Sequence, residues 1–144
     1  MKIYLAASVF SVFERELNVS IAKMITELGG HSVFLPQEVA PPETEDGLDM
    51  EYIYKECRDH IDSSDAILAI VDGSDVDSGV AWELGYAFAK NVPSLCIRTD
   101  IRKAEHNGVN IMIEYGASKT IHLTKYHQKI KDVVDRIIEE LEAI

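Results

Sequence analysis

The most informative stretch of this chain is residues 66–89, AILAIVDGSDVDSGVAWELGYAFA. Residues 66–71 are a short apolar run typical of a buried parallel strand, and the residues after Asp77 have helical spacing. An acid-rich loop therefore joins a strand to a helix. We expect Glu83 in the second turn of that helix, on one face with Gly79, Val80, Tyr86 and Ala87.

A carboxylate on that face needs a physical reason, because charged side chains usually stay in water. The simplest alternative is an amphipathic helix with Glu83 at the edge of its polar face. The acidic loop before the helix and the glycines on either side of Glu83 favour a functional site instead.

Strand and helix patterns alternate along the whole chain. Strand patterns occupy residues 3–7, 32–35, 66–71, 94–97 and 120–123. The first helix is expected to end at Gly29-Gly30. Besides the Glu83 helix, three apolar stripes mark helices: Phe13, Leu17, Ile21, Ile25 and Leu28; Met50, Ile53, Tyr54, Cys57 and Ile61; and Ile130, Val133, Val134, Ile137, Ile138 and Leu141. This alternation predicts one α/β domain over residues 1–144. We expect a doubly wound, flavodoxin-like, five-stranded parallel sheet of order 2-1-3-4-5 with helices on both faces.

Composition restricts the classes of partner. The 144 residues carry a formal net charge of −11, so we expect no nucleic-acid surface and a small molecule as the main ligand. Only Cys57 and Cys96 are present, without clustered histidines, which argues against a disulfide scaffold or structural zinc. No apolar run approaches the length of a membrane span, so we expect a cytoplasmic protein without membrane contact.

In a sheet of this order, ligands bind beyond the carboxyl ends of the strands, where strand order reverses. That rule places residues 7–10 opposite residues 72–77, with Glu83 behind them. Residues 36–47 form a long polar loop and a candidate lid, and residues 100–108 form a second polar connection.

A carboxylate partly withdrawn from water can act as nucleophile, general base or metal ligand. A metal site would use Asp72, Asp75 and Asp77, but the acid that completes a calcium loop is missing. The glycine of this loop has no neighbouring lysine to hold a phosphate, and Ala6-Ala7-Ser8 lacks the acidic pair of a receiver domain. We therefore expect no metal and no cofactor.

Four segments, taken in order, resemble the motifs of nucleoside 2-deoxyribosyltransferases. They are YLAASVFS at 4–11, SDAI at 64–67, DSGVAWELGYA at 77–87 and NIM at 110–112. The resemblance extends from residue 3 to about the last helix, and its specific part is the segment around Glu83. It implies cleavage of the N-glycosidic bond of a 2'-deoxynucleoside and transfer of the sugar to another free nucleobase.

The resemblance also implies roles for individual residues. Glu83 would be the nucleophile that forms a covalent deoxyribosyl intermediate, and Tyr4 would position it. The substrate-binding residues implied by the motifs are Asp77 and Asn110 at the 5'-hydroxyl, Phe10 near the base, and Ser8, Gly79 and Met112. Because Asn110 and Met112 match residues that complete a neighbouring subunit's site, a homodimer or larger homo-oligomer is implied. Without the resemblance, Asp77 and Asn110 would be interpreted as helix caps, and Tyr4 and Phe10 as core aromatics.

Two departures from the family pattern leave alternatives open. Cys57 occupies the position of an aspartate that assists the leaving base, so the proton donor is unassigned. Ser8 resembles a serine that contacts phosphate in the related 2'-deoxynucleoside 5'-phosphate N-hydrolases, whereas Asp77 would repel a phosphate. We weight Asp77 more and expect nucleosides. The alternatives are an N-hydrolase acting on nucleosides or their 5'-phosphates, and a non-catalytic nucleotide-binding module.

Overall fold

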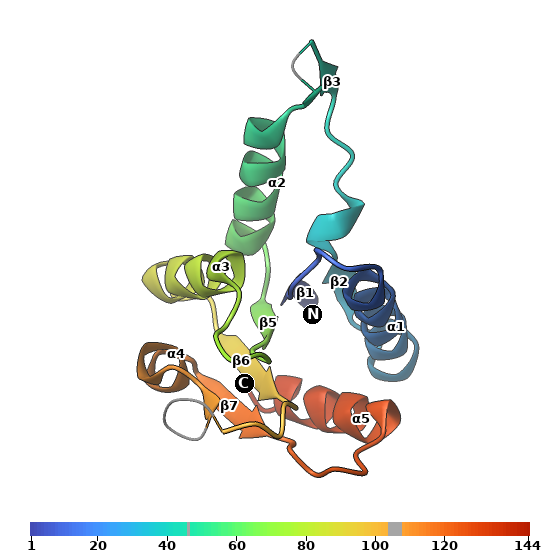
Figure 1. Ribbon diagram of the computed structural model, residues 1–144, viewed down its shortest axis with the longest axis vertical. Coiled ribbons are helices and arrows are strands. Elements are labelled where there is room, and N and C mark those ends of the chain that lie inside the picture. Colours follow the sequence, from blue (N-terminus) through green and yellow to red (C-terminus); the bar gives the residue numbers. More distant parts are fainter. Residues whose placement is uncertain (46, 104–107) are drawn as a thin grey trace.

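The structure, a computed structural model, describes residues 1–45, 47–103 and 108–144. Its central sheet contains β1 (Lys2–Ala6), β2 (Ser32–Phe34), β5 (Ala66–Ile70), β6 (Ser94–Arg98) and β7 (Lys119–His122). All neighbouring strands of this sheet are parallel, in the order β2-β1-β5-β6-β7. Counted along the chain this is the order 2-1-3-4-5, so the predicted doubly wound, flavodoxin-like α/β fold is confirmed (Figure 1).

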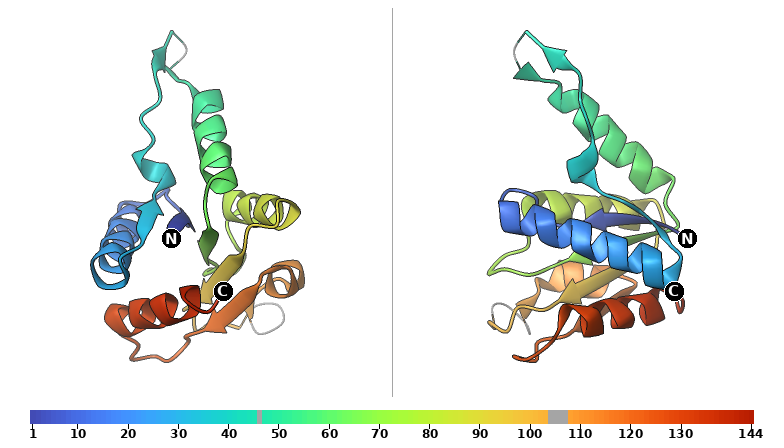
Figure 2. Two further views of the ribbon diagram at one scale, coloured as in Figure 1. Left: turned by 180° about the vertical axis from the view of Figure 1, so that it is seen from behind. Right: turned by 90° about the vertical axis from the view of Figure 1, so that its right-hand side faces the viewer.

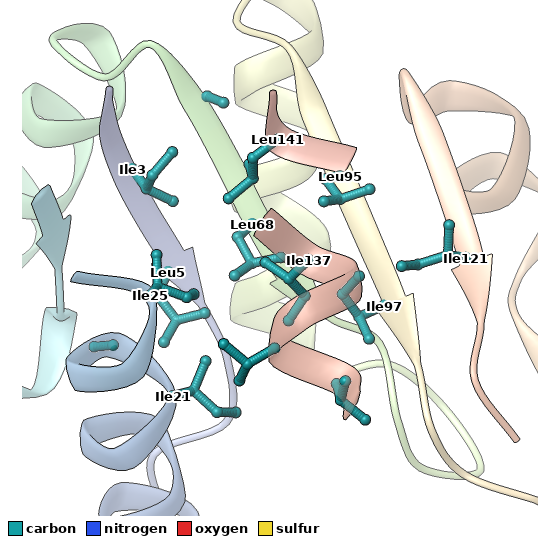
Figure 3. Close-up of a cluster of buried hydrophobic side chains, with 14 of the residues drawn as sticks. Ile3, Leu5, Ile21, Ile25, Leu68, Leu95, Ile97, Ile121, Ile137 and Leu141 are labelled. Carbon is teal, nitrogen blue, oxygen red and sulfur yellow. The ribbon is translucent and has the colours of Figure 1, made fainter. Parts of the chain in front are cut away.

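Helices cover both faces of the sheet (Figures 1 and 2). One face packs against α1 (Val12–Gly29) and α5 (Ile130–Leu141), and the other packs against α2 (Met50–Asp62) and α3 (Ser78–Ala89). Figure 3 shows the first core, in which Ile21 and Ile25 of α1 and Ile137 of α5 lie over the strands. Strand side chains alternate between the faces, so Tyr4 points away from this core and toward α2 and α3.

The apolar stripe predicted for the first helix is only partly correct. Phe13, Leu17 and Leu28 are exposed, and the buried positions of α1 are Asn18, Ile21, Ala22 and Ile25. Steps of four residues drift by about 40° per step around a helix, so a long stripe at that spacing turns out of the interface. The ends of the helix agree with expectation, because Gly30 caps α1 in the left-handed conformation.

The prediction for the second helix is wrong for two residues of its stripe, Met50 and Tyr54. Only Ile61 is buried in α2, and Met50 and Tyr54 are exposed. The cause is geometric, since the N-terminal part of α2 extends beyond the sheet (Figure 1). At its far end lies a short hairpin of β3 (Glu43–Thr44) and β4 (Gly47–Leu48).

The first of the two polar connections contains more structure than a loop. Residues 36–47 include the 3-10 turn η1 (Pro36–Glu38) and the strand β3, and their role as a lid stays a prediction. Residues 104–107 of the second connection lie outside the described residues. After it comes α4 (Ile111–Gly116), a short helix beside α3.

Candidate active site

Glu83 and Tyr4 form the centre of the candidate site. Val80, Leu84 and Ala87 anchor α3 on the sheet, which holds Glu83 beside the buried ring of Tyr4 from β1. The Tyr4 hydroxyl donates a hydrogen bond of 2.5 Å to Oε1 of Glu83. The sequence placed these residues at separate positions, and the fold brings them into direct contact.

The surroundings of Glu83 favour its neutral form more than water does. Burial raises the pKa of Glu83 from its ordinary 4.5 to about 7; the hydrogen bond from Tyr4 opposes this increase, and the negative charge of Asp77 adds to it. Burial and the neighbouring charge of Glu83 also raise the pKa of Tyr4, so the phenol stays protonated and remains a donor. A partly dehydrated carboxylate that titrates near neutral pH is suited to nucleophilic or general-base chemistry.

Cys57 of α2 lies in the same place. Its side chain is half-buried and packs against the buried cluster that contains Tyr4. Burial raises the pKa of the thiol; Tyr4 opposes this increase, and the charges of Glu83 and Glu56 add to it. The residue that departs from the family pattern therefore lies close to Tyr4 and Glu83.

Aromatic stacking supports Tyr4 from the side of β2, which the sequence analysis did not foresee. The ring of Phe34 lies 5.4 Å from that of Tyr4 and stacks on His60 of α2 at 3.6 Å. Phe34 pairs with Tyr4 in the parallel register of β1 and β2, so the two rings share a face. The alternation of side chains along each strand can be read from the sequence, but the register that pairs β1 with β2 cannot.

Asp77 begins α3 as its N-cap. Its Oδ1 atom accepts hydrogen bonds from the amides of Gly79 at 2.9 Å and Val80 at 3.2 Å. The cap interpretation is thus confirmed for Asp77, and Gly79 is one of its donors. Both amides bind the same oxygen, which leaves Oδ2 for another partner.

The loop before Asp77 is fixed from β6. Arg98 is fully buried and donates to the carbonyls of Val71 at 2.8 Å and Gly73 at 2.7 Å. Gly73 has a φ of 109°, a conformation that favours glycine, and a Cβ there would lie 2.8 Å from a backbone oxygen of Asp75. The role of Arg98 could not be predicted, because a position in a strand does not show how deeply its side chain is buried.

Asp72 also helps to hold this loop beside the end of β6. Its Oδ1 atom accepts from the backbone amides of Thr99 at 2.6 Å and Asp100 at 2.9 Å. Across residues 1–45, 47–103 and 108–144, no three histidine, cysteine or acidic side chains are grouped to hold a metal ion.

Ser8 and Phe10 follow β1 at the carboxyl end of the sheet. The Ser8 carbonyl accepts a hydrogen bond of 3.0 Å from Asn18. The amide of Ser11, with help from Ser8, lowers the pKa of Glu14. Phe10 is 77% exposed, so the alternative of a core aromatic is wrong for this residue.

Asn110 and Met112 lie on the other side of α3 from Glu83. Asn110 caps α4 by accepting a hydrogen bond of 2.9 Å from the amide of Met112, whose side chain is 78% exposed. Both line a hollow of about 620 Å³ between α3 and α4 that Glu83 and Tyr4 do not line. The structure does not bring these two residues to the Glu83 of their own protomer.

A second hollow lies beside Phe34, the aromatic neighbour of Tyr4. It measures about 410 Å³ between η1 and α2, and Phe34, Tyr52 and Glu56 are in its lining. Neither Glu83 nor Tyr4 lines this hollow, but Phe34 in its lining contacts the ring of Tyr4.

Comparison with known proteins gives a family and a fold. Residues 3–135 match the sequence family described as nucleoside 2-deoxyribosyltransferase. A 2-deoxyribosyltransferase from Bacillus psychrosaccharolyticus is 29% identical, with 94% of this chain and 91% of that chain covered and a TM-score of 0.70. The comparison with curated proteins found no significant match.

Two more distant structures share the fold. A 2-desoxiribosyltransferase from Leishmania mexicana has 20% identity and a TM-score of 0.67, with 96% of this chain and 97% of that chain covered. A CMP N-glycosidase from Clostridium botulinum has 16% identity and a TM-score of 0.61, with 99% and 98% covered. Within the described residues, no helix combines the length and apolarity needed to cross a membrane.

Proposed function

The chain belongs to the nucleoside 2-deoxyribosyltransferase family, and from that premise we propose that it cleaves 2'-deoxynucleosides and transfers the sugar to a second base. The observation that carries this proposal is the Glu83 carboxylate, partly withdrawn from water and held by Tyr4 at 2.5 Å. A retaining glycosyl transfer needs a carboxylate that is both fixed in direction and weakly solvated. Glu83 meets both requirements.

The reaction proceeds in two displacements at the anomeric carbon. A Glu83 oxygen attacks C1' of the sugar, the bond from C1' to the base nitrogen breaks, and its electron pair leaves with the base, which takes up a proton. The nitrogen of a second base then attacks C1', which releases the Glu83 carboxylate, and that base loses its proton. Two inversions give net retention of configuration. Tyr4 holds Oε1, so Oε2 is the attacking atom.

Charge favours nucleosides over nucleotides as substrates. Asp77 keeps Oδ2 available after capping α3 and can accept a hydrogen bond from a 5'-hydroxyl. A 5'-phosphate would meet that carboxylate and also the partly exposed Glu14 carboxylate near Ser8. Like charges repel, so both carboxylates oppose a phosphate.

The nucleobase is assigned to the hollow between η1 and α2. Its volume of about 410 Å³ lies within the range of small-molecule sites. Phe34 offers an aromatic surface in this hollow. We propose that Phe10, which is mostly exposed and follows β1, covers the base.

We also propose a homo-oligomer in which Asn110 and Met112 complete the site of a neighbouring subunit. Both residues line the hollow beyond α3, where Phe88 is 68% and Tyr115 is 76% exposed. Large apolar side chains gathered at one hollow are typical of a protein interface. Mixing two inactive variants, Glu83→Gln and Asn110→Ala, should restore activity, because hybrid assemblies contain sites with both native residues. Mixtures that stay inactive would contradict shared sites.

Incubation with deoxyinosine and free cytosine tests the activity. Formation of deoxycytidine is expected, and the Glu83→Ala variant should form none while still binding nucleoside. Release of hypoxanthine without deoxycytidine would assign an N-hydrolase instead. A protein that binds nucleosides but leaves both substrates unchanged would be a binding module.

A further inference from the structure

The side chains that line the hollow between η1 and α2 carry negative charge and no positive charge. The polar ones are Glu38 of η1 and Tyr52 and Glu56 of α2. Among the residues that the structure describes, no lysine, arginine or histidine lines this hollow. Carboxylate oxygens accept hydrogen bonds and repel other acceptors. The hollow therefore favours a base that presents N–H groups to it.

Glu56 is held next to the aromatic side of this hollow. Its Oε2 atom lies 3.9 Å from Nε2 of His60, one turn further along α2, and the His60 ring stacks on Phe34 with the two centroids 3.6 Å apart. Within the described part of the chain, neither oxygen of Glu56 accepts a hydrogen bond. Both oxygens are therefore available to a ligand that packs against Phe34.

Nucleobases differ in what they present to a carboxylate. Guanine carries two donors side by side, the ring N1–H and the 2-amino group, which can meet both oxygens of one carboxylate in the way that an arginine fork does. Adenine and cytosine present one amino group beside a bare ring nitrogen, and hypoxanthine presents its N1–H alone. Thymine and uracil place N3–H between two carbonyls, whose oxygens a carboxylate repels. Guanine therefore matches Glu56 best.

We propose that Glu56 determines the base specificity of the site, by accepting hydrogen bonds from the N1–H and the 2-amino group of a guanine that packs on Phe34. This inference rests on the proposed function, which assigns the nucleobase to this hollow. The preferred sugar donor is then 2'-deoxyguanosine. Glu38, whose carboxylate adds to the negative charge of the lining, strengthens the rejection of bases with two carbonyls. Glu56 binds the base and makes no bond to C1'.

Deoxyguanosine and deoxyinosine are matched probes, because they differ only in the 2-amino group. Calorimetry with the Glu83→Ala variant measures their binding without turnover. Deoxyguanosine should bind roughly 10- to 100-fold more tightly, which corresponds to one hydrogen bond to a charged group. When Glu56→Gln is added, that preference should fall to about threefold or less, because the amide keeps only one acceptor oxygen. Thymidine should then bind more tightly, because the glutamine amide can donate to a carbonyl.

Glu51→Gln in the same background is the matched control, since Glu51 is an exposed glutamate of α2 that does not line the hollow. It should leave the preference unchanged. Equal affinities for the two probes, a preference that survives Glu56→Gln, or one that is lost in Glu38→Gln instead would overturn the proposal. Wild-type protein that shows the preference but neither transfers nor hydrolyses would refute the proposed function alone. Turnover of deoxynucleosides with equal affinities would refute only the role of Glu56.

Discussion

Replacement of Glu83 by Gln should stabilise the protein by an amount that grows with pH. The native pKa of Glu83 is about 7, above its ordinary 4.5, so the folded state binds this proton more tightly than the unfolded state. Wild-type stability therefore falls as pH rises from about 4.5 to about 7 and is lowest above that range. At about 1.4 kcal/mol per pH unit, the interval corresponds to roughly 3 kcal/mol.

The glutamine variant escapes this cost, because its amide oxygen can still accept from Tyr4 but carries no charge. Urea unfolding of both proteins at several values between pH 5 and pH 9 measures the difference in unfolding free energy. That difference should increase with pH and level off near pH 8. Glu16→Gln is the matched control, since Glu16 is an exposed residue of α1. A difference that is the same at every pH would show that Glu83 is not desolvated, and the reasoning about its nucleophilicity would fail.

Three further substitutions test the site around Glu83. Tyr4→Phe should lower kcat/KM by roughly 10- to 100-fold, which corresponds to the loss of a hydrogen bond to a charged group. It should also move the acid limb of the pH–rate profile to higher pH, because the hydrogen bond from Tyr4 lowers the pKa of Glu83. An unchanged profile would contradict the hydrogen bond between Tyr4 and Glu83. Asp77→Asn should keep the helix cap. It should move the acid limb of the pH–rate profile to lower pH, because a charge that raises the pKa of Glu83 is gone. It should also reduce the preference for deoxycytidine over its 5'-monophosphate. Equal discrimination by both proteins would refute the role of Asp77 at the 5' end. Arg98→Met should cost about 3 kcal/mol of unfolding free energy in urea, since buried carbonyls of the loop lose their donor; a variant as stable as the wild type would contradict that anchoring role.

The sheet order could be predicted because alternating strand and helix patterns leave few topologies for a parallel sheet. The incorrect predictions concern which helical residues are covered by the sheet. Met50 and Tyr54 have helical spacing like that of a buried stripe, yet α2 extends past the strands and leaves them exposed. Periodicity reports which side chains share a face, and it does not report whether anything covers that face.

For the site, motif resemblance identified Glu83 and Tyr4, and the structure adds their contact and the desolvation. Two neighbours could not be read from the sequence. Phe34 reaches Tyr4 through a strand register that no local pattern specifies. Arg98 is a charged residue in a fully buried strand, and it is tolerated there because backbone carbonyls of the next loop accept its hydrogen bonds.

Mass spectrometry after incubation with a 2'-fluoro-arabinosyl nucleoside measures whether a sugar becomes bonded to the protein, because the fluorine slows release of the intermediate. The expected result is one added fluorosugar per chain, on the peptide that contains Glu83, and none in Glu83→Gln. Label on another residue, or turnover of deoxynucleosides by the Glu83→Gln variant at the native rate, would contradict the assignment of Glu83 as the nucleophile.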